Sequence, residues 1–191
     1  TELKTDRNSI DIWGRRYTFS DTGLPLSFVS QGKSLLAGEA VLEVYTGGKK
    51  LPISVTSPFV FAEKTPGQVS AVSQIKAGEV AMELKSTTEY DGFTLFKLTY
   101  RPVDNKPVRV GRIRLKVPLT GEYVRFYSAA GDTMGTGILG EVVPQKDGRF
   151  YDSYNNTRSV AVSPSFATVF WAGDYETCFC YSSDICKGWV L

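Results

Sequence analysis

The chain of 191 residues contains no histidine. A Ser-His-Asp or Cys-His nucleophile system needs an imidazole as its proton relay, and His-ligated zinc or iron sites need one as a ligand. Both kinds of site are therefore excluded. The chemistry that remains open is that of carboxylates, Tyr and Lys.

Neither charge sign is in excess, and long hydrophobic runs are missing. The 22 Lys and Arg residues against 20 Asp and Glu residues give a net charge of +2. Such a mixed balance provides no field suited to a nucleic acid or an anionic membrane. No apolar run approaches the length of about 18 residues that indicates a membrane helix. We expect neither a nucleic-acid partner nor a membrane span.

Cysteine is scarce, with three residues in the chain. Cys178 and Cys180 flank one residue of a predicted strand and so share a face, and Cys186 follows a short turn. A Cys180–Cys186 bridge, a three-Cys zinc site and buried reduced thiols are the alternatives. The spacing matches paired C-x₂-C ligands poorly, so we favour buried reduced thiols and expect no metal or cofactor.

The pattern that is present has a period of two. Val80, Met82 and Leu84 alternate with polar residues, which predicts a half-buried strand, and Asp91-Gly92 then predicts a type I′ hairpin turn. Further strands are expected at residues 10–13, 16–19, 41–45, 60–63, 69–75, 93–101, 112–117, 159–162, 167–171 and 177–181. Many short strands with Gly and Pro between them predict an all-β fold, a large antiparallel β-sandwich forming a single domain over residues 1–191.

A basic stripe runs along one predicted strand and the residues before it. It comprises Arg109, Arg112, Arg114 and Lys116. Three of these four share one strand face, where phosphate contacts could line up. Acidic residues on neighbouring predicted strands, such as Glu83 and Glu89, would offset the charge. A solvated sheet face is the favoured interpretation.

A glycine-rich segment at residues 129–157 interrupts the strand pattern. Its Tyr151, Tyr154 and Asn155 suit sugar recognition, because Tyr rings stack on pyranose faces and amides bond to hydroxyl groups. A surface excursion anchored by these rings is the favoured alternative. Residues 135–140 match G-x-G-x-x-G but lack a βαβ frame, so nucleotide binding is not predicted.

Loop carboxylates are the remaining route to catalysis. A glycosidase needs two carboxylates about 5–10 Å apart, one acting as acid and one as nucleophile or base. The loop candidates are Asp132, Asp147, Asp152, Asp174, Glu176 and Asp184. Most loop acids are solvated charges, so no catalytic residue is assigned.

The C-terminal residues resemble a known family. They are Trp171-Ala172-Gly173-Asp174, then Cys180, Tyr181, Asp184 and Lys187-Gly188-Trp189. This stretch resembles the W-x-G-D … C-W-F-x-E-x-x-K-G-W stretch in the N-terminal β-sandwich domain of bacterial proteins related to glycoside hydrolase family 123. Residues 13–19, 63–66 and 112–119 agree in the same order. The departures are Tyr181 for Trp, Asp184 for Glu and Cys178 for Gly.

The resemblance implies a galactose-mutarotase-like supersandwich that precedes a (β/α)₈ barrel, with the glycosidase carboxylates in the barrel. Without histidine, mutarotase chemistry does not come with this fold. We therefore expect a non-catalytic domain, truncated from a longer protein, that supports a C-terminal catalytic barrel and contacts glycan. The expected ligand-binding residues are Tyr151, Tyr154, Asn155, Asp174, Asp184 and Trp189.

Two other functions stay open at this point. One is a stand-alone carbohydrate-binding module, and the other is a small glycosidase that uses the loop carboxylates. The chain begins at Thr1 without a basic or apolar leader, so either a signal peptide has been removed or the sequence was trimmed. We expect a periplasmic or extracellular protein whose signal peptide has been removed.

Overall fold

The structure is a computed structural model that describes residues 3–131, 137–144, 148 and 167–183. Its contacts divide the chain into two compact units, Thr1–Pro118 and Leu119–Leu191. The described residues form β-strands and one short 3₁₀ turn, η1 (Gly121–Tyr123), and the strands pair antiparallel. The predicted all-β antiparallel fold is confirmed. The single domain over residues 1–191 stays a prediction.

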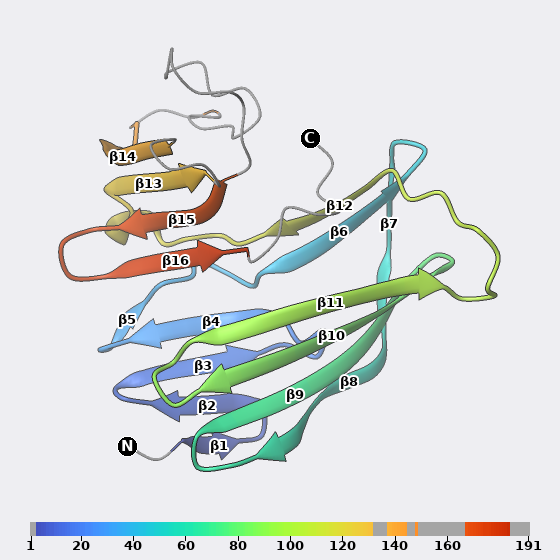
Figure 1. Ribbon diagram of the computed structural model, residues 1–191, viewed down its shortest axis with the longest axis horizontal. Helices are drawn as coiled ribbons and strands as arrows, with labels where there is room; N and C mark the ends of the chain where they lie inside the picture. Colours follow the sequence, from blue (N-terminus) through green and yellow to red (C-terminus); the bar gives the residue numbers. More distant parts are fainter. Residues whose placement is uncertain (1–2, 132–136, 145–147, 149–166, 184–191) are drawn as a thin grey trace. The chain divides into compact units, whose positions relative to one another are not determined.

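The first unit begins with a five-stranded meander in the order β1-β2-β3-β4-β5 (Figure 1). Its strands are β1 (Lys4–Asp6), β2 (Ser9–Ile12), β3 (Arg15–Phe19), β4 (Pro25–Ser30) and β5 (Lys33–Ser34). Each strand is joined to the next by a short turn, so neighbours in the chain are neighbours in the sheet.

Two more sheets complete this unit. A four-stranded meander, β11-β10-β9-β8, consists of β8 (Ile53–Lys64), β9 (Gln68–Ala77), β10 (Val80–Glu89) and β11 (Thr94–Pro102). A three-stranded sheet, β12-β6-β7, consists of β6 (Val41–Thr46), β7 (Lys49–Leu51) and β12 (Arg112–Lys116).

The four-stranded sheet buries one face. Along β10, Val80, Met82 and Leu84 are 2–5% exposed, whereas the residues between them are half-buried or exposed. The neighbouring β9 alternates in the same way over its whole length. The strand predicted from this alternation is confirmed.

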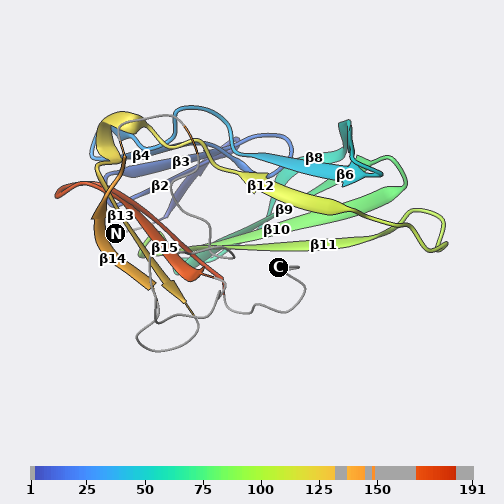
Figure 2. The same cartoon turned by 90° about the horizontal axis from the view of Figure 1, so that it is seen from above.

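Both other sheets cover that buried face. Ile10 and Phe19 of the five-stranded sheet pack against Phe59 and Val69 of the four-stranded sheet. Val44 of the three-stranded sheet packs in a second cluster with residues of β9 and β10. Figure 2 shows the two layers edge-on, with β6 and β12 in one layer and β10 and β11 in the other. The first unit is therefore a β-sandwich.

The hairpin between β10 and β11 forms where Asp91-Gly92 predicts it, but with another turn. Gly92 has a φ of +91°, whereas Asp91 is not among the described residues with positive φ. The Gly92 amide donates to the Glu89 carbonyl, and the Glu89 amide donates to the Phe93 carbonyl. This pattern fits a longer loop closed by one left-handed Gly. The predicted type I′ turn is wrong, because Phe93 belongs to the loop.

The second unit contains a four-stranded sheet in the order β14-β13-β15-β16. Its strands are β13 (Phe126–Gly131), β14 (Gly137–Val142), β15 (Ala167–Gly173) and β16 (Cys178–Ser182). Tyr127 and Ala172 form its buried cluster, against which Leu119, Val124 and Phe170 pack. The strand expected at residues 159–162 lies outside the described residues. In the described ranges, no helix is long and apolar enough to cross a membrane.

The aromatic contact between Phe19 and Phe59 gives a test of the sandwich core. Phe19 is 0% exposed, and its ring stacks on Phe59 at 5.0 Å between centroids. We expect Phe19→Ala to lower the free energy of unfolding by about 3–5 kcal/mol, because it leaves a cavity between the sheets. Urea denaturation measures the loss. Leu95→Ala, at a side chain 52% exposed, should change it by less than about 0.5 kcal/mol. Equal losses would contradict this core.

Candidate functional site

Trp13 lies in a turn, not at the end of a strand as its sequence position predicts. Ile12 pairs with Arg15, so Trp13 and Gly14 alone form the loop of the β2–β3 hairpin. Their φ angles are +45° and +71°, and a two-residue type I′ turn requires positive values at both positions. A bulky side chain at positive φ costs about 1–3 kcal/mol. Trp13 is therefore held in a strained conformation.

A second turn holds the Trp13 turn in place. Gln31-Gly32 connects β4 to β5 with φ angles of +49° and +79°. The Gln31 amide donates to the Gly14 carbonyl at 2.9 Å, and the Gln31 side-chain amide donates to the Trp13 carbonyl at 3.4 Å. These bonds reach the backbone carbonyls of Gly14 and Trp13, and neither involves the Trp13 side chain. The residue itself stays 48% exposed, so burial in the core does not explain the strain.

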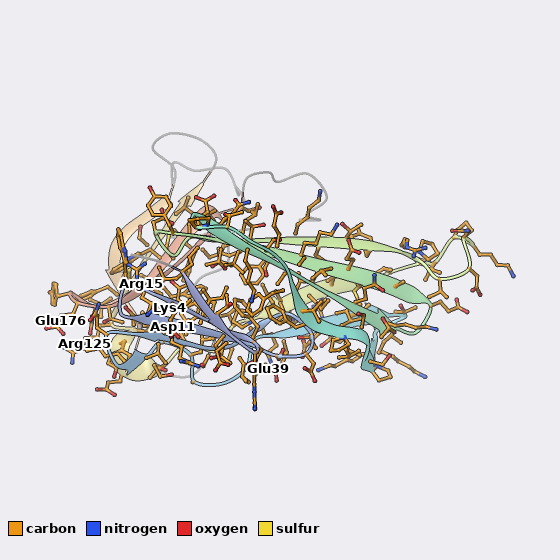
Figure 3. The ribbon with its side chains drawn as sticks, turned by 90° about the horizontal axis from the view of Figure 1, so that it is seen from below. Lys4, Asp11, Arg15, Glu39, Arg125 and Glu176 are labelled. Atoms are coloured by element: carbon orange, nitrogen blue, oxygen red, sulfur yellow. The ribbon has the colours of Figure 1, made fainter. Side chains whose placement is uncertain are left out.

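A shallow pocket of about 340 Å³ lies beside Trp13 on the five-stranded sheet. Its lining includes Lys4, Asp11, Trp13, Arg15, Arg16 and Val29. Figure 3 labels Lys4, Asp11 and Arg15, which lie near one another in this part of the sheet. The volume is at the lower end of the range of about 300–1,000 Å³ that small-molecule sites occupy.

Charged side chains form a row across the sheet at the pocket. Asp11 pairs with Lys4 on one side and with Arg16 on the other. One Arg16 nitrogen donates to both Asp11 oxygens, at 3.1 and 3.3 Å, and another lies 3.6 Å from Asp6. These exposed ion pairs add little stability, but they place hydrogen-bond donors and acceptors at the pocket that Trp13 also lines.

Arg15 connects the pocket to the β10–β11 hairpin. Its guanidinium donates to the Asp91 carbonyl at 2.6 Å, and the Tyr17 hydroxyl donates to the Gly92 carbonyl at 3.2 Å. Burial is the main reason why the pKa of Tyr17 lies above its usual value. Gly92 has a φ of +91°, which favours glycine, and a Cβ there would lie 2.6 Å from the Arg15 nitrogen, so the Arg15 side chain would have to move. Arg15 is thereby fixed at the edge of the pocket.

The arrangement at the Trp13 pocket suits a sugar. An indole ring offers a flat apolar surface with a polar edge. The Asp11 carboxylate accepts hydrogen bonds and the Arg16 guanidinium donates them, so together they can serve neighbouring hydroxyl groups. The sequence interpretation missed Trp13. A Trp-Gly pair between two alternating runs was the available signal, because Trp is a poor residue for such a turn.

The outer face of the three-stranded sheet is the second notable surface, and we call it the basic face. It consists of Glu43 and Tyr45 on β6, Lys50 on β7, and Arg112, Arg114 and Lys116 on β12. The Glu43 carboxylate lies 2.8 Å from Lys50, 3.6 Å from Arg114 and 3.9 Å from Lys116. The Tyr45 hydroxyl donates to it at 3.0 Å. The Arg112 guanidinium lies 4.5 Å from the Tyr45 ring centroid.

Glu43 is the carboxylate that the ion pairs of this face share. Its side chain is 7% exposed. The hydrogen bond from Lys50 is the largest cause that holds the pKa of Glu43 below its usual value, and the Tyr45 hydroxyl acts in the same direction. The same contact raises the pKa of Lys50. Both groups are therefore charged at neutral pH.

The basic stripe is only partly as predicted. Arg112, Arg114 and Lys116 share one face, as expected. Glu83 and Glu89 do not offset them, because β12 pairs with β6 whereas both acids lie on β10. Glu83 lies 3.2 Å from Lys85 instead. The carboxylate that does offset the stripe, Glu43, comes from a strand far away in the sequence.

Asp174 is the one predicted ligand residue within the described part of the chain. Its carboxylate accepts hydrogen bonds from the Glu176 amide at 2.9 Å and the Thr177 amide at 2.7 Å, at the β15–β16 turn. A Cβ at Gly173 would lie 2.4 Å from the Thr177 carbonyl oxygen. The Gly-Asp pair of the W-x-G-D motif thus builds a turn. A ligand role of Asp174 stays a prediction.

The other predicted ligand residues lie outside the described residues. They are Tyr151, Tyr154, Asn155, Asp184 and Trp189. The same holds for the loop acids Asp132, Asp147 and Asp152, and for Cys186. Their predicted roles are untested.

Cys178 and Cys180 share a face of β16, as predicted, and both are free thiols. The prediction that they are buried is wrong. Both residues are exposed, because the strand alternates between exposed and half-buried positions. Partial burial is the larger cause that raises the pKa of the Cys180 thiol, and the neighbouring Cys178 adds to it. Among the residues that the structure describes, no group of three or more His, Cys, Asp or Glu could hold a metal ion.

Comparison with known proteins gives one family. A family model described as "Glycoside hydrolase 123, third domain" matches residues 3–181. The family named by the sequence resemblance is confirmed. The description calls this domain the third, whereas the resemblance placed it at the N-terminus of the parent. A search of curated proteins gives no match.

The turn function of Asp174 can be tested locally. We expect Asp174→Ala to speed hydrogen exchange of the Glu176 and Thr177 amides, because both lose their acceptor. The associated destabilisation should be about 1–2 kcal/mol. Asp174→Asn keeps an acceptor oxygen and should change both rates much less. Unchanged protection in Asp174→Ala, measured by NMR, would contradict the turn function.

The Glu43 contacts predict a pH dependence of stability. The folded pKa lies below the ordinary value of 4.5, so Glu43 contributes stability above that pH and loses it as the pH falls through the folded pKa. We expect Glu43→Gln to flatten the acid side of the profile, measured by urea unfolding between pH 7 and about pH 3. Glu83→Gln, at a more exposed pair, is the control and should keep the wild-type slope. A wild-type slope in Glu43→Gln would rule out this linkage.

Proposed function

Because the chain belongs to the glycoside hydrolase 123 third-domain family, we propose that it is a non-catalytic sandwich domain that supports a catalytic barrel and binds glycan at the Trp13 pocket. The family places the chain in a glycan context and beside other domains of a parent protein. The observation that carries the binding part is the strained, exposed Trp13, which lines a shallow pocket together with charged side chains.

The carboxylates of the described residues support a non-catalytic function. A glycosidase acid needs a raised pKa so that it is protonated before it acts. The buried carboxylate Glu43 has a lowered pKa instead. Asp11 is bound to Arg16, and Asp174 accepts hydrogen bonds within its own turn. Each of these three acids is thus engaged in contacts that hold the fold, and Glu43 is held in its charged form.

The strain at Trp13 supports binding at this pocket. Asn, Asp or Gly occupies the first position of a type I′ turn with little strain, so Trp is among the least favourable choices there. A residue held in a locally unfavourable backbone conformation, with no gain in packing, is expected at a functional site. The Asp11–Arg16 pair next to Trp13 supplies the polar contacts that a sugar needs.

The proposal includes a periplasmic or extracellular location, where polymeric glycans are accessible. It also includes contacts from the other predicted ligand residues, Tyr151, Tyr154, Asn155, Asp184 and Trp189. A stand-alone carbohydrate-binding module would use the same pocket, and differs only in having no barrel to support.

Exchange of Trp13 for Asn separates binding from folding. Asn-Gly is the preferred type I′ pair, so Trp13→Asn should raise the free energy of unfolding by about 0.5–1 kcal/mol. The same change should reduce glycan affinity at least tenfold, because the stacking surface is lost. A neutral oligosaccharide selected on a glycan array, followed by calorimetry at millimolar concentration, measures the affinity.

Tyr100→Asn is the matched control, since it removes an aromatic residue 56% exposed on β11 of the same unit. It should leave the affinity unchanged. Equal losses in both variants, or an array without any binder, would overturn the binding part. A Trp13→Asn variant that loses stability would show that the ring packs rather than binds.

A further inference from the structure

We propose that the basic face is a second, separate binding site that takes an anionic polysaccharide, a chain carrying carboxylate or sulfate groups on successive sugars. It lies on a different sheet from the Trp13 pocket. The proposal goes beyond the proposed function and does not depend on it. Three features of the face carry it: charge excess, fixed geometry and linear spacing.

The first feature is a local excess of positive charge. Lys50, Arg112, Arg114 and Lys116 are four cations around the single carboxylate of Glu43, which leaves the face at +3. The whole chain has a net charge of only +2. The remaining residues therefore sum to −1, so the net positive charge of the chain comes from this face. Such a patch attracts anions, although the near-neutral composition of the whole chain does not indicate anion binding.

The second feature is that the cations are already held in position. Glu43 draws Lys50, Arg114 and Lys116 towards one point, and Tyr45 supports Arg112 through its ring. The cationic side chains stay about half-exposed around a carboxylate that is itself covered. Ordering long side chains before binding lowers the entropy that binding costs. One carboxylate cannot neutralise four cations, so the face keeps capacity for a further anion.

The third feature is the line that the cations form. Arg112, Arg114 and Lys116 are alternate residues of one strand, so their Cα atoms follow one another at about 6.8 Å along β12. Cations at successive positions along one exposed strand suit an extended chain with repeated charges better than a single small anion. Arg side chains bind carboxylate and sulfate-like oxygens through two parallel hydrogen bonds. A linear polysaccharide with acidic groups meets both requirements.

The test compares two double variants of equal charge. Arg112→Ser with Arg114→Ser removes two cations from the basic face, and Lys85→Ser with Lys97→Ser removes two exposed cations that pair across β10 and β11. Each lowers the net charge from +2 to zero. The full chain is titrated with polygalacturonate and with dextran sulfate, and uncharged dextran is the blank. The two polymers distinguish carboxylate from sulfate recognition.

We expect wild-type affinity for at least one acidic polymer to fall steeply with salt. The basic-face variant should lose about tenfold in affinity at about 50 mM salt, and the slope of log affinity against log salt should drop by about 1–2. The Lys85/Lys97 variant should stay near wild type. Thermal unfolding of both variants checks that they are folded. Arg112→Lys with Arg114→Lys keeps the charge but loses the two parallel hydrogen bonds, so it should weaken binding while keeping the wild-type salt slope, and it tests the site even where the Ser variant does not fold.

Several outcomes would overturn the proposal. Equal losses in the two double variants would show that only the overall charge matters. Equal affinity for duplex DNA or polyglutamate at matched charge density would show unspecific anion attraction. Loss of acidic-polymer binding in Trp13→Asn would assign it to the Trp13 pocket. If Trp13→Asn still binds the acidic polymer and the wild-type chain binds no neutral sugar, the proposed function is overturned and this proposal stands.

Discussion

The first unit depends on one constraint, that a single face of β9 and β10 must be buried along its whole length. These strands alternate strictly, and apolar side chains such as Ile75 and Met82 are about 2% exposed. Two polar members of the same face have hydrogen-bond partners: Ser73 donates to the Thr22 carbonyl at 2.6 Å, and the Thr88 and Thr94 hydroxyls lie 3.1 Å apart. A face of this length needs more cover than one short meander provides, so two sheets pack on it.

The same alternation determines where function can reside. In a strand, successive side chains point to opposite faces, so burying Ile10 and Ile12 turns Asp11 outwards, and burying Val44 turns Glu43 and Tyr45 outwards. A slip of one residue would reverse every side chain and place charges in the core. The Trp13 pocket and the basic face are therefore consequences of core packing on two different sheets.

The sequence was informative wherever a local rule decides the structure. Alternation identified β10, and Asp91-Gly92 identified its hairpin, because both signals depend on neighbours in the chain. The turn type was missed because it depends on the length of the loop. The strand register sets that length by placing Thr88 opposite Thr94. The partner of Arg114 was also missed. Glu43 lies 71 positions earlier, and only the β6–β12 pairing brings the two residues together.

Two Trp-containing motifs show how far a motif alone supports a functional site. In Trp171-Ala172-Gly173-Asp174, Ala172 is buried, Gly173 permits close backbone approach, and Asp174 caps the following turn. Packing and hydrogen bonds therefore account for Ala172, Gly173 and Asp174 of that motif. In Trp13-Gly14, only the glycine suits the turn, and the Trp is strained and exposed. The more recognisable motif is thus explained by structure, whereas the less conspicuous one carries a conformational cost that burial in the core does not explain.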